Sequence, residues 1–158
     1  MMCVLETLPE DHAWVENVLV DRWGSTTIIS RGRTHEADQI PGYILWEKGQ
    51  RMGLITYRID GESCEIVTLD CHVEGKGIGK AMIDTMRNRA KVSGCDRLWI
   101  ITTNDNLPAQ CFYQKRGFLL TKLYPGAVGA SRLLKPSIPL VGYADIPIRD
   151  EIRLEMHL

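Results

Sequence analysis

Apolar residues in the first third of the chain recur at the spacing of a strand and then at that of a helix. A short apolar run at 2–6 predicts the first strand. Thr7 and Glu10 have the spacing of a capping box, so we expect a helix to begin there and to end at Gly24. Its buried stripe is expected to be Trp14, Val15, Val18, Leu19 and Trp23. The β-branched run at 26–30 then predicts another strand.

Three further strands are predicted in the middle of the chain. Residues 43–47 and 52–59 are apolar runs joined by a polar turn with a glycine, which is the pattern of a hairpin. Residues 65–71 form the next strand. Since side chains alternate along a strand, one face of it is expected to carry Glu65, Val67, Leu69 and Cys71.

Helices alternate with strands in the second half. Apolar residues at intervals of four predict an amphipathic helix whose buried stripe is Ile78, Met82, Met86 and Ala90. A strand at 98–103, a helix at 106–116 and strands at 118–123 and 149–158 follow. This alternation predicts an α/β (α+β) fold in which helices pack on a mixed sheet.

The segment 124–148 is rich in proline, glycine and small residues. A short helix is expected at 127–134 and an extended stretch at 135–139. Because a connection of this length in a compact domain is usually functional, we expect it to form a wall of a substrate pocket. A dimer contact and a plain surface excursion are the alternatives.

Length and composition restrict the class of protein. At 158 residues the chain is expected to form a single domain, residues 1–158. A formal net charge of −1 argues against a nucleic-acid or membrane partner. No apolar run could span a bilayer, no signal peptide is recognised, and the five cysteines form no C-x-x-C pair, which predicts a cytoplasmic protein with reduced thiols. The four histidines lack metal-ligand spacing, so no metal is expected.

An apolar strand at 66–71 leads directly through a glycine-rich turn into a helix. The turn contains three glycines in five residues: Gly75, Gly77 and Gly79. Free backbone N–H groups and the positive end of a helix dipole together form an anion site, most often for phosphate. A Walker A loop is excluded, because Glu74 stands five residues before Gly79 and alanine follows Lys80. The dinucleotide motif G-x-G-x-x-G is not matched either.

A second stretch, 104–118, has clear helix signals. Asn106 is a good N-cap, Pro108 suits the first turn, and Gly117 suits a left-handed residue after the helix. Together with the glycine turn, this stretch resembles the GNAT N-acetyltransferase superfamily. The family signature N-x-x-A-x-x-F-Y-x-x-x-G-F is matched at Asn106, Ala109, Phe112, Tyr113, Gly117 and Phe118. Its loop [QR]-x-x-G-x-[GA] is matched at Gly77 and Gly79, with Glu74 in place of Gln or Arg.

The resemblance implies a fold and a co-substrate. The fold would be a mixed, mostly antiparallel sheet of about seven strands flanked by helices. Acetyl-CoA would bind with its pyrophosphate on the glycine turn and its pantetheine arm along the end of the fourth strand. The residues so implied are Leu69, Cys71, Val73, Gly75, Lys76, Gly77, Ile78, Gly79, Lys80, Asn104, Asn106 and Phe112.

The resemblance also implies direct attack of a primary amine on the thioester in a ternary complex. Tyr113 matches the tyrosine that protonates the departing thiolate, and a phenol with a reference pKa of about 10 is protonated near neutral pH. Glu65 is placed as the family glutamate that takes the amine proton directly or through water. Asp70 and His72 remain rivals for the role of base. A covalent acetyl-cysteine route is set aside, because no cysteine has an evident partner histidine.

The sequence does not name the acceptor, which is expected to be a small-molecule or peptide amine. The segment after the first helix often borders the acceptor site in this family, so Arg31, Arg33 and His35, with His72, are candidate substrate-binding residues. Two cations two residues apart on an extended chain point the same way and would suit an anionic acceptor, whereas a solvated loop is the alternative. The resemblance leaves a homodimer open. An acyl-CoA sensor without transfer activity is the alternative function, which Glu74 favours.

Overall fold

Seven strands form the main sheet of the protein, and a separate hairpin lies beside it. The structure, a computed structural model, describes residues 1–158. The strands of the sheet are β1 (Met2–Glu6), β4 (Gly42–Glu47), β5 (Gln50–Asp60), β6 (Ser63–Cys71), β7 (Arg97–Thr103), β8 (Leu119–Tyr124) and β9 (Glu151–His157). The hairpin consists of β2 (Thr27–Ser30) and β3 (Arg33–Glu36).

Four α-helices and two short 3-10 turns complete the fold. The helices are α1 (His12–Trp23), α2 (Ile78–Val92), α3 (Leu107–Lys115) and α4 (Ala127–Leu134), and the turns are η1 (Pro9–Asp11) and η2 (Tyr143–Asp145). The predicted helices and strands are all present, and β3 is an additional strand, in the stretch that carries Arg33 and His35. The extended stretch predicted at 135–139 is wrong: a turn lies there, in which the N–H of Ile138 donates to the carbonyl of Lys135. None of these helices combines the length and the apolar character needed to cross a bilayer.

The strand order is β1-β4-β5-β6-β7-β9-β8, and every neighbouring pair is antiparallel except β6 with β7. The predicted mixed, mostly antiparallel sheet is therefore confirmed. The last strand, β9, does not lie at an edge, because it inserts between β7 and β8. Residues far apart in sequence thus meet at the centre of the sheet.

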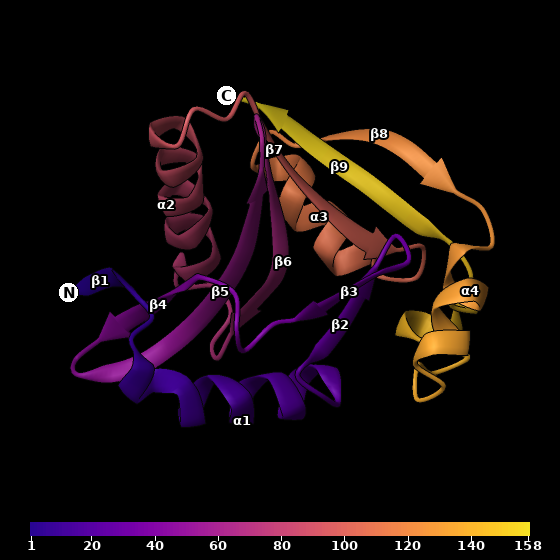
Figure 1. The fold of residues 1–158 in the computed structure, drawn as a ribbon, viewed down its shortest axis with the longest axis horizontal. Coiled ribbons are helices and arrows are strands. Elements are labelled where there is room, and N and C mark those ends of the chain that lie inside the picture. Colours follow the sequence, from indigo (N-terminus) through magenta and orange to yellow (C-terminus); the bar gives the residue numbers. More distant parts are fainter.

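The two faces of the sheet carry separate hydrophobic cores. On one face α2 and α3 pack over the sheet, with Met82, Met86 and Phe118 fully buried. On the other face α1 and the hairpin contribute a smaller core around Leu19 and Ile28. Figure 1 shows α2 and α1 against different parts of the sheet, with α4 beyond the hairpin. The molecule is therefore layered, with the sheet in the middle.

A bulge in β6 changes which residues share a face. The pairing of β6 with β5 skips Val67, so β6 has one residue more than its partner there. Glu65 and Val67 consequently lie on the face of α1, whereas Leu69 and Cys71 pack on the face of α2. The expectation that all four residues share one face is wrong, since strict alternation fails at a bulge.

The first helix is capped one residue later than predicted. The carboxylate of Asp11 accepts a hydrogen bond of 2.9 Å from the backbone N–H of Leu8, so the interaction expected of Thr7 and Glu10 is displaced by one position. At the other end Gly24 has a φ of 80° and ends α1 in the left-handed conformation, as predicted.

The segment between β8 and β9 crosses the hairpin face and is here called the strap, residues 125–150. Lys135 Nζ fastens it to the end of α1 and the start of β2, donating hydrogen bonds to the carbonyl oxygens of Trp23 (3.1 Å) and Thr27 (2.9 Å). Arg132 ties the strap to itself, donating to the carbonyl oxygens of Pro139 (2.7 Å) and Ile148 (2.6 Å). The strap therefore covers one side of the sheet at its centre.

Candidate active site

The only parallel pair of strands separates into a fork. β6 and β7 are paired from Ser63 with Arg97 to Ile66 with Ile100, and no pairing continues beyond this point. In Figure 1 the two strands lie together near the top and diverge downward. Past the fork, the facing edges of β6 and β7 have backbone N–H and C=O groups without a strand partner. An extended ligand could pair with such an edge.

The glycine turn lies directly after β6 and begins α2. Gly75 and Gly77 have φ values of 78° and 76°, in the left-handed region that favours glycine, and neither is crowded by other atoms. The first helical hydrogen bond runs from the N–H of Ala81 to the carbonyl of Gly77. The N–H groups of the three intervening residues therefore have no helical partner and are available to an anion.

The other residues that were predicted to bind acetyl-CoA around this turn differ in their exposure to solvent. Ile78 and Gly79 are buried, so only their backbone N–H groups can serve a ligand, whereas Val73 is exposed. The ammonium groups of Lys76 and Lys80 are exposed and lie near carboxylates, Lys76 at 3.9 Å from Glu47 and Lys80 at 2.9 Å from Asp84. Both lysines remain candidates for contact with phosphate groups, which stays a prediction.

Helix α3 places the second motif beside the first. Asn106 is its N-cap, and its Oδ1 accepts a hydrogen bond of 3.2 Å from the N–H of Ala109, as predicted. Gly117 follows the helix with a φ of 98°, also as predicted. Phe112 projects onto the first turn of α2 at Gly79. The two stretches that stood out in the sequence are therefore in direct contact.

Tyr113 lies at the inner side of α3. Its side chain is buried and has edge-to-face contacts with the rings of Phe112 (5.1 Å between centroids) and Phe118 (5.3 Å). Burial raises the pKa of its phenol, and the neighbouring Asp70 and Cys71 raise it further. The phenol is therefore held in its protonated form, as a proton donor must be.

Glu65 lies on the opposite face of the sheet from Tyr113, in a buried polar cluster. Its Oε2 accepts a hydrogen bond of 2.9 Å from the hydroxyl of Ser30 on β2, and its Oε1 lies 3.7 Å from Nε2 of His35 on β3. Burial raises the pKa of Glu65, and the Ser30 hydrogen bond partly offsets that rise. A carboxylate with a raised pKa is a stronger base than an ordinary one.

The histidine and arginine residues proposed to bind the acceptor do not form one site. Arg31 and Gly32 form the tight turn of the β2–β3 hairpin, and the Arg31 guanidinium stacks on the ring of Tyr124 at 3.5 Å. Arg33 instead forms an ion pair with Asp60 at 2.6 Å. The two cations therefore do not point the same way, because the chain turns between them instead of staying extended.

His72 and Asn104 have partners within the protein, whereas both ring nitrogens of His35 are buried without a hydrogen-bond partner. His35 is fully buried, and burial together with Arg58 and Arg33 lowers its pKa to about 4, so it is neutral. His72 is exposed and stacks on Trp14, with 5.6 Å between ring centroids. Asn104 holds the strap: its Nδ2 donates to the carbonyl of Pro147, and its Oδ1 accepts from the N–H groups of Arg149 and Asp150. We therefore leave Asn104 out of the proposed acetyl-CoA site.

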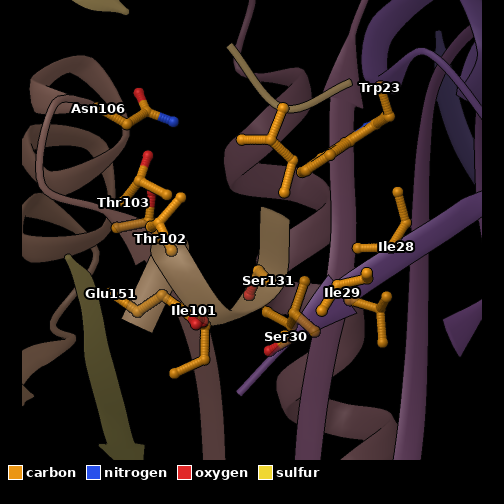
Figure 2. Close-up of a pocket in the computed structure, with 14 residues that line it drawn as sticks. Trp23, Ile28, Ile29, Ser30, Ile101, Thr102, Thr103, Asn106, Ser131 and Glu151 are labelled. Atoms are coloured by element: carbon orange, nitrogen blue, oxygen red, sulfur yellow. The ribbon is translucent and has the colours of Figure 1, made fainter. Parts of the chain in front are cut away.

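A pocket of about 140 Å³ opens at the fork, on the face opposite α2. Figure 2 shows side chains from β2, β7, β9 and α4 that surround it. Eight of its 14 lining residues are hydrophobic, and the strap contributes Val128, Ser131 and Ile138. Segment 124–148 therefore forms a wall of a pocket, and that a substrate binds there stays a prediction. The lining residues are Trp23, Ile28, Ile29, Ser30, Ile66, Val67, Ile101, Thr102, Thr103, Asn106, Val128, Ser131, Ile138 and Glu151.

Glu151 is a pocket residue that the sequence did not reveal. It is the first residue of β9, only 4% exposed, and it is the only charged side chain in the lining. Its Oε2 accepts a hydrogen bond of 3.1 Å from the N–H of Arg31, whereas its Oε1 is buried without any partner. Glu151 lies in the stretch I-P-I-R-D-E-I at 146–152, which assigned it no role, and only the tertiary fold places it beside the strap and the hairpin.

Comparisons with known proteins agree with this geometry. The model of the Acetyltransferase (GNAT) family matches residues 5–118. The protein YdhI of Bacillus subtilis (strain 168) is 44% identical over 131 residues, which are 82% of this chain and 82% of YdhI. The solved structure of an IAA acetyltransferase from Bacillus cereus ATCC 14579 has a TM-score of 0.75 and 22% identity, over 100% of both chains. A GNAT family acetyltransferase from Elizabethkingia anophelis with acetyl-CoA bound has a TM-score of 0.68 and 20% identity, over 99% and 98%.

The solved structures show which fold this chain shares, and the family model and YdhI show which family it belongs to. The two solved structures are remote in sequence and show that the fold is shared. The family model covers most of the chain, including the glycine turn and the second motif on α3. The family predicted from those two motifs is therefore confirmed, and the chain belongs to the GNAT family of acetyltransferases.

Proposed function

We propose that the protein transfers the acetyl group of acetyl-CoA to a primary amine by direct attack in a ternary complex. One observation carries this proposal: the fork between β6 and β7 lies between a phenol and a carboxylate. The protonated phenol of Tyr113 lies on the α3 side, and the buried carboxylate of Glu65 lies on the hairpin side. A proton donor and a proton acceptor on opposite sides of one opening suit a reaction that removes one proton and supplies another.

The acetyl donor would bind along the fork. The free N–H groups at the start of α2 and the left-handed glycines before it suit the pyrophosphate of coenzyme A. The stretch from Leu69, near the end of β6, to Val73, just after it, faces the fork without a partner strand and suits the amide groups of the pantetheine arm. Phe112, Asn106 and the exposed lysines 76 and 80 border the same region. The thioester would then lie at the fork, where both substrates can be held in reacting geometry.

The transfer itself requires three proton movements. The ammonium form of the acceptor loses a proton through the hydroxyl of Ser30 to Glu65, and the neutral amine attacks the thioester carbonyl. A C–N bond forms, the C–S bond breaks, and the thiolate of coenzyme A takes the proton of Tyr113. The nitrogen loses its second proton as the tetrahedral intermediate collapses, and this proton restores the phenol of Tyr113. Asp70 is a weaker candidate for the base, because its carboxylate already accepts a hydrogen bond of 2.9 Å from the indole of Trp23.

A sensor that binds acyl-CoA without transfer is the second candidate, and one observation favours it. Glu74 places an exposed carboxylate in the turn where the family loop begins with Gln or Arg. A negative charge near a pyrophosphate weakens binding unless the side chain turns into solvent. The two functions differ in whether coenzyme A is released.

Two measurements on the purified protein test the proposal. Thermal unfolding is followed with acetyl-CoA, CoA, NAD and ATP, since a ligand at a hundred times its Kd stabilises a protein by about 2.7 kcal/mol. We expect acetyl-CoA and CoA alone to raise Tm, and we expect a pool of primary amines to release free thiol from acetyl-CoA. A rise in Tm without thiol release supports the sensor, and a rise with NAD or ATP, or with none of the four, contradicts both functions.

A further inference from the structure

We propose that the pocket beneath the strap binds the acceptor, and that this acceptor is a compact aliphatic primary amine whose single ammonium group is held by Glu151. This inference rests on the proposed function and specifies the class of its second substrate. Three independent features of the pocket support it: its charge, its size and its closure by the strap.

The charge of the pocket calls for a cation. Glu151 is the only ionisable residue in the lining, and no arginine or lysine faces it there. One oxygen of its carboxylate has a hydrogen bond from the N–H of Arg31, and the other has no partner although it is buried. An unsatisfied buried carboxylate oxygen is unfavourable, and an ammonium group that donates to it removes that cost. A carboxylate on the ligand would instead be repelled.

The size and polarity of the pocket favour a small ligand that is apolar except for one charged group. A cavity of about 150 Å³ in another protein takes up benzene, so a pocket of about 140 Å³ fits a molecule of similar size. Away from Glu151 the walls combine apolar residues such as Ile28 and Ile138 with uncharged polar ones such as Asn106, and they hold no second carboxylate. A diamine would have to bury its second ammonium without an anionic partner, which is unfavourable.

The strap limits the length of the ligand. Val128, Ser131 and Ile138 line the pocket from the strap, and Lys135 fastens the strap to the carbonyl oxygens of Trp23 and Thr27. Figure 2 shows Ser131 and Glu151 reaching towards the same space from α4 and β9. An extended peptide behind the reacting amine would have to pass these strap residues. A free small molecule is therefore favoured over a peptide N-terminus.

The position of the ammonium agrees with the proposed chemistry. Ser30 lines the pocket together with Glu151, and the hydroxyl of Ser30 donates to the base Glu65. An amine held on Glu151 is therefore bound in the same pocket as the hydroxyl that leads to the base. Ile66 and Val67, at the opening of the fork, form the floor next to the expected thioester.

Matched pairs of amines test the class of acceptor. The kcat/KM for acetylation is measured by thiol release and by the mass of the product. 3-Methylbutylamine is compared with leucine, which adds a carboxylate to the same body, and pentylamine with cadaverine, which adds a second ammonium. We expect each monoamine to exceed its partner at least about tenfold, which corresponds to about 1.4 kcal/mol. A dipeptide with an N-terminal leucine is expected to react no better than leucine.

A matched pair of variants tests the role of Glu151. In Glu151→Gln the amide oxygen can still accept from the N–H of Arg31, but the negative charge is lost. We expect the KM for 3-methylbutylamine to rise at least about tenfold with acetyl-CoA affinity unchanged by calorimetry. Glu155→Gln is the control, since Glu155 lies on the same strand, pairs with Arg153 at 2.7 Å and is outside the pocket. Ile138→Phe, which reduces the pocket without touching Glu151, is expected to raise KM for the same amine.

The outcomes separate this inference from the proposed function. Acetylation of leucine or cadaverine at the rate of the monoamines, or an unchanged KM in both Glu151→Gln and Ile138→Phe, overturns the inference and leaves acetyl transfer intact. Binding of acetyl-CoA without acetylation of any monoamine also overturns it, whether or not another amine reacts. Failure to bind acetyl-CoA at all removes the proposed function and the inference with it.

Discussion

The ring of Phe112 lies directly against the backbone of Gly79. A Cβ atom built on Gly79 would be 2.8 Å from Cζ of Phe112 and 2.9 Å from Cε2, closer than carbon atoms approach in proteins. Gly79 therefore has to be a glycine for reasons of space, since its φ is not in the left-handed region. This contact joins the start of α2, where the pyrophosphate is proposed to bind, to the helix that carries Tyr113.

Gly79→Ala is expected to destabilise the protein by about 1–3 kcal/mol, because the ring of Phe112 has to shift out of a packed position. The change is measured by urea unfolding. Gly129→Ala is the control: Gly129 is exposed within α4 and has free space around it, so alanine there is expected to stabilise by about 0.5–1 kcal/mol. A second substitution, Phe112→Leu, is expected to recover part of the loss; equal stability of Gly79→Ala and the wild type contradicts the crowding.

Gly77→Glu is expected to raise the Kd for coenzyme A at least about tenfold, since it brings a negative charge to the proposed pyrophosphate site. Calorimetric titration measures this Kd. The new residue is also strained, because Gly77 has a φ of 76°. Gly24→Glu introduces the same residue at a φ of 80° with equally free space, but at the end of α1. An equal loss of affinity in both variants would mean that strain, and not charge, is responsible.

Tyr113→Phe is expected to lower kcat by about ten- to ten-thousand-fold with little change in the Kd for acetyl-CoA, because only the proton donor is lost. Rapid-quench or steady-state thiol release measures kcat. Tyr43→Phe serves as control, since Tyr43 is a buried tyrosine of the same core on β4. If Tyr113→Phe retains full turnover, another group protonates the thiolate.

Ser30→Ala is expected to lower kcat/KM, because the hydroxyl that passes the proton to Glu65 is lost, and to move the acidic limb of the pH profile of kcat/KM to higher pH. The Ser30 hydroxyl donates to the ionised form of Glu65 and thereby lowers its pKa, which burial has raised. Without this hydrogen bond the pKa of Glu65 rises further, so the base is protonated, and inactive, up to a higher pH. Ser63→Ala, at the start of β6, is expected to leave the profile in place, and an identical shift in both variants contradicts the role of Ser30.

His35 is expected to make the protein less stable in acid. Burial and the nearby Arg58 and Arg33 lower the pKa of His35 to about 4. Two carboxyl groups also face the ring: Asp60 acts in the opposite direction on this pKa, and Glu65 lies 3.7 Å from Nε2. Between pH 6.5 and 4 the unfolded state therefore binds a proton that the folded state does not, so stability falls as pH falls, by up to about 3 kcal/mol.

Urea unfolding of His35→Leu at pH 7 and pH 4.5 measures this contribution. The loss of stability on acidification is expected to be smaller in His35→Leu than in the wild type. Glu65, whose raised pKa acts with the opposite sign, is present in both proteins, so the difference isolates the histidine. Equal losses would assign the acid sensitivity to other groups.

Local signals in the sequence predicted most of the elements and the local geometry of the glycine turn and of the start of α3. Asn106 caps α3 through its side chain, and Gly75, Gly77 and Gly117 adopt positive φ values. Both properties depend on a few neighbouring residues, so a short window of sequence is enough to predict them. The faces of β6 could not be predicted in the same way. The bulge at Val67 depends on the pairing with β5, and no local pattern announces it.

The acceptor side depended on contacts between distant segments. Arg31 and Arg33 looked like a pair because the turn between them was not recognised, and they bind Tyr124 and Asp60 instead. Glu151 is far in sequence from the hairpin that contacts it, so its buried, half-paired carboxylate is a product of the tertiary fold. Sequence spacing carries no information about such a meeting.

The insertion of β9 between β7 and β8 brings residues from the end of the chain next to the stretch that the family model matches. The stretch that the family model matches ends at Phe118 and contains the glycine turn, the fork and Tyr113. Glu151 and the strap lie beyond that stretch, yet β9 brings them to the same opening. The proposed donor site thus lies within the matched stretch, whereas part of the proposed acceptor pocket lies after it in sequence and beside it in space. If both proposals hold, exchanging residues 125–151 between relatives is expected to change the preference for acceptors with little effect on the binding of acetyl-CoA.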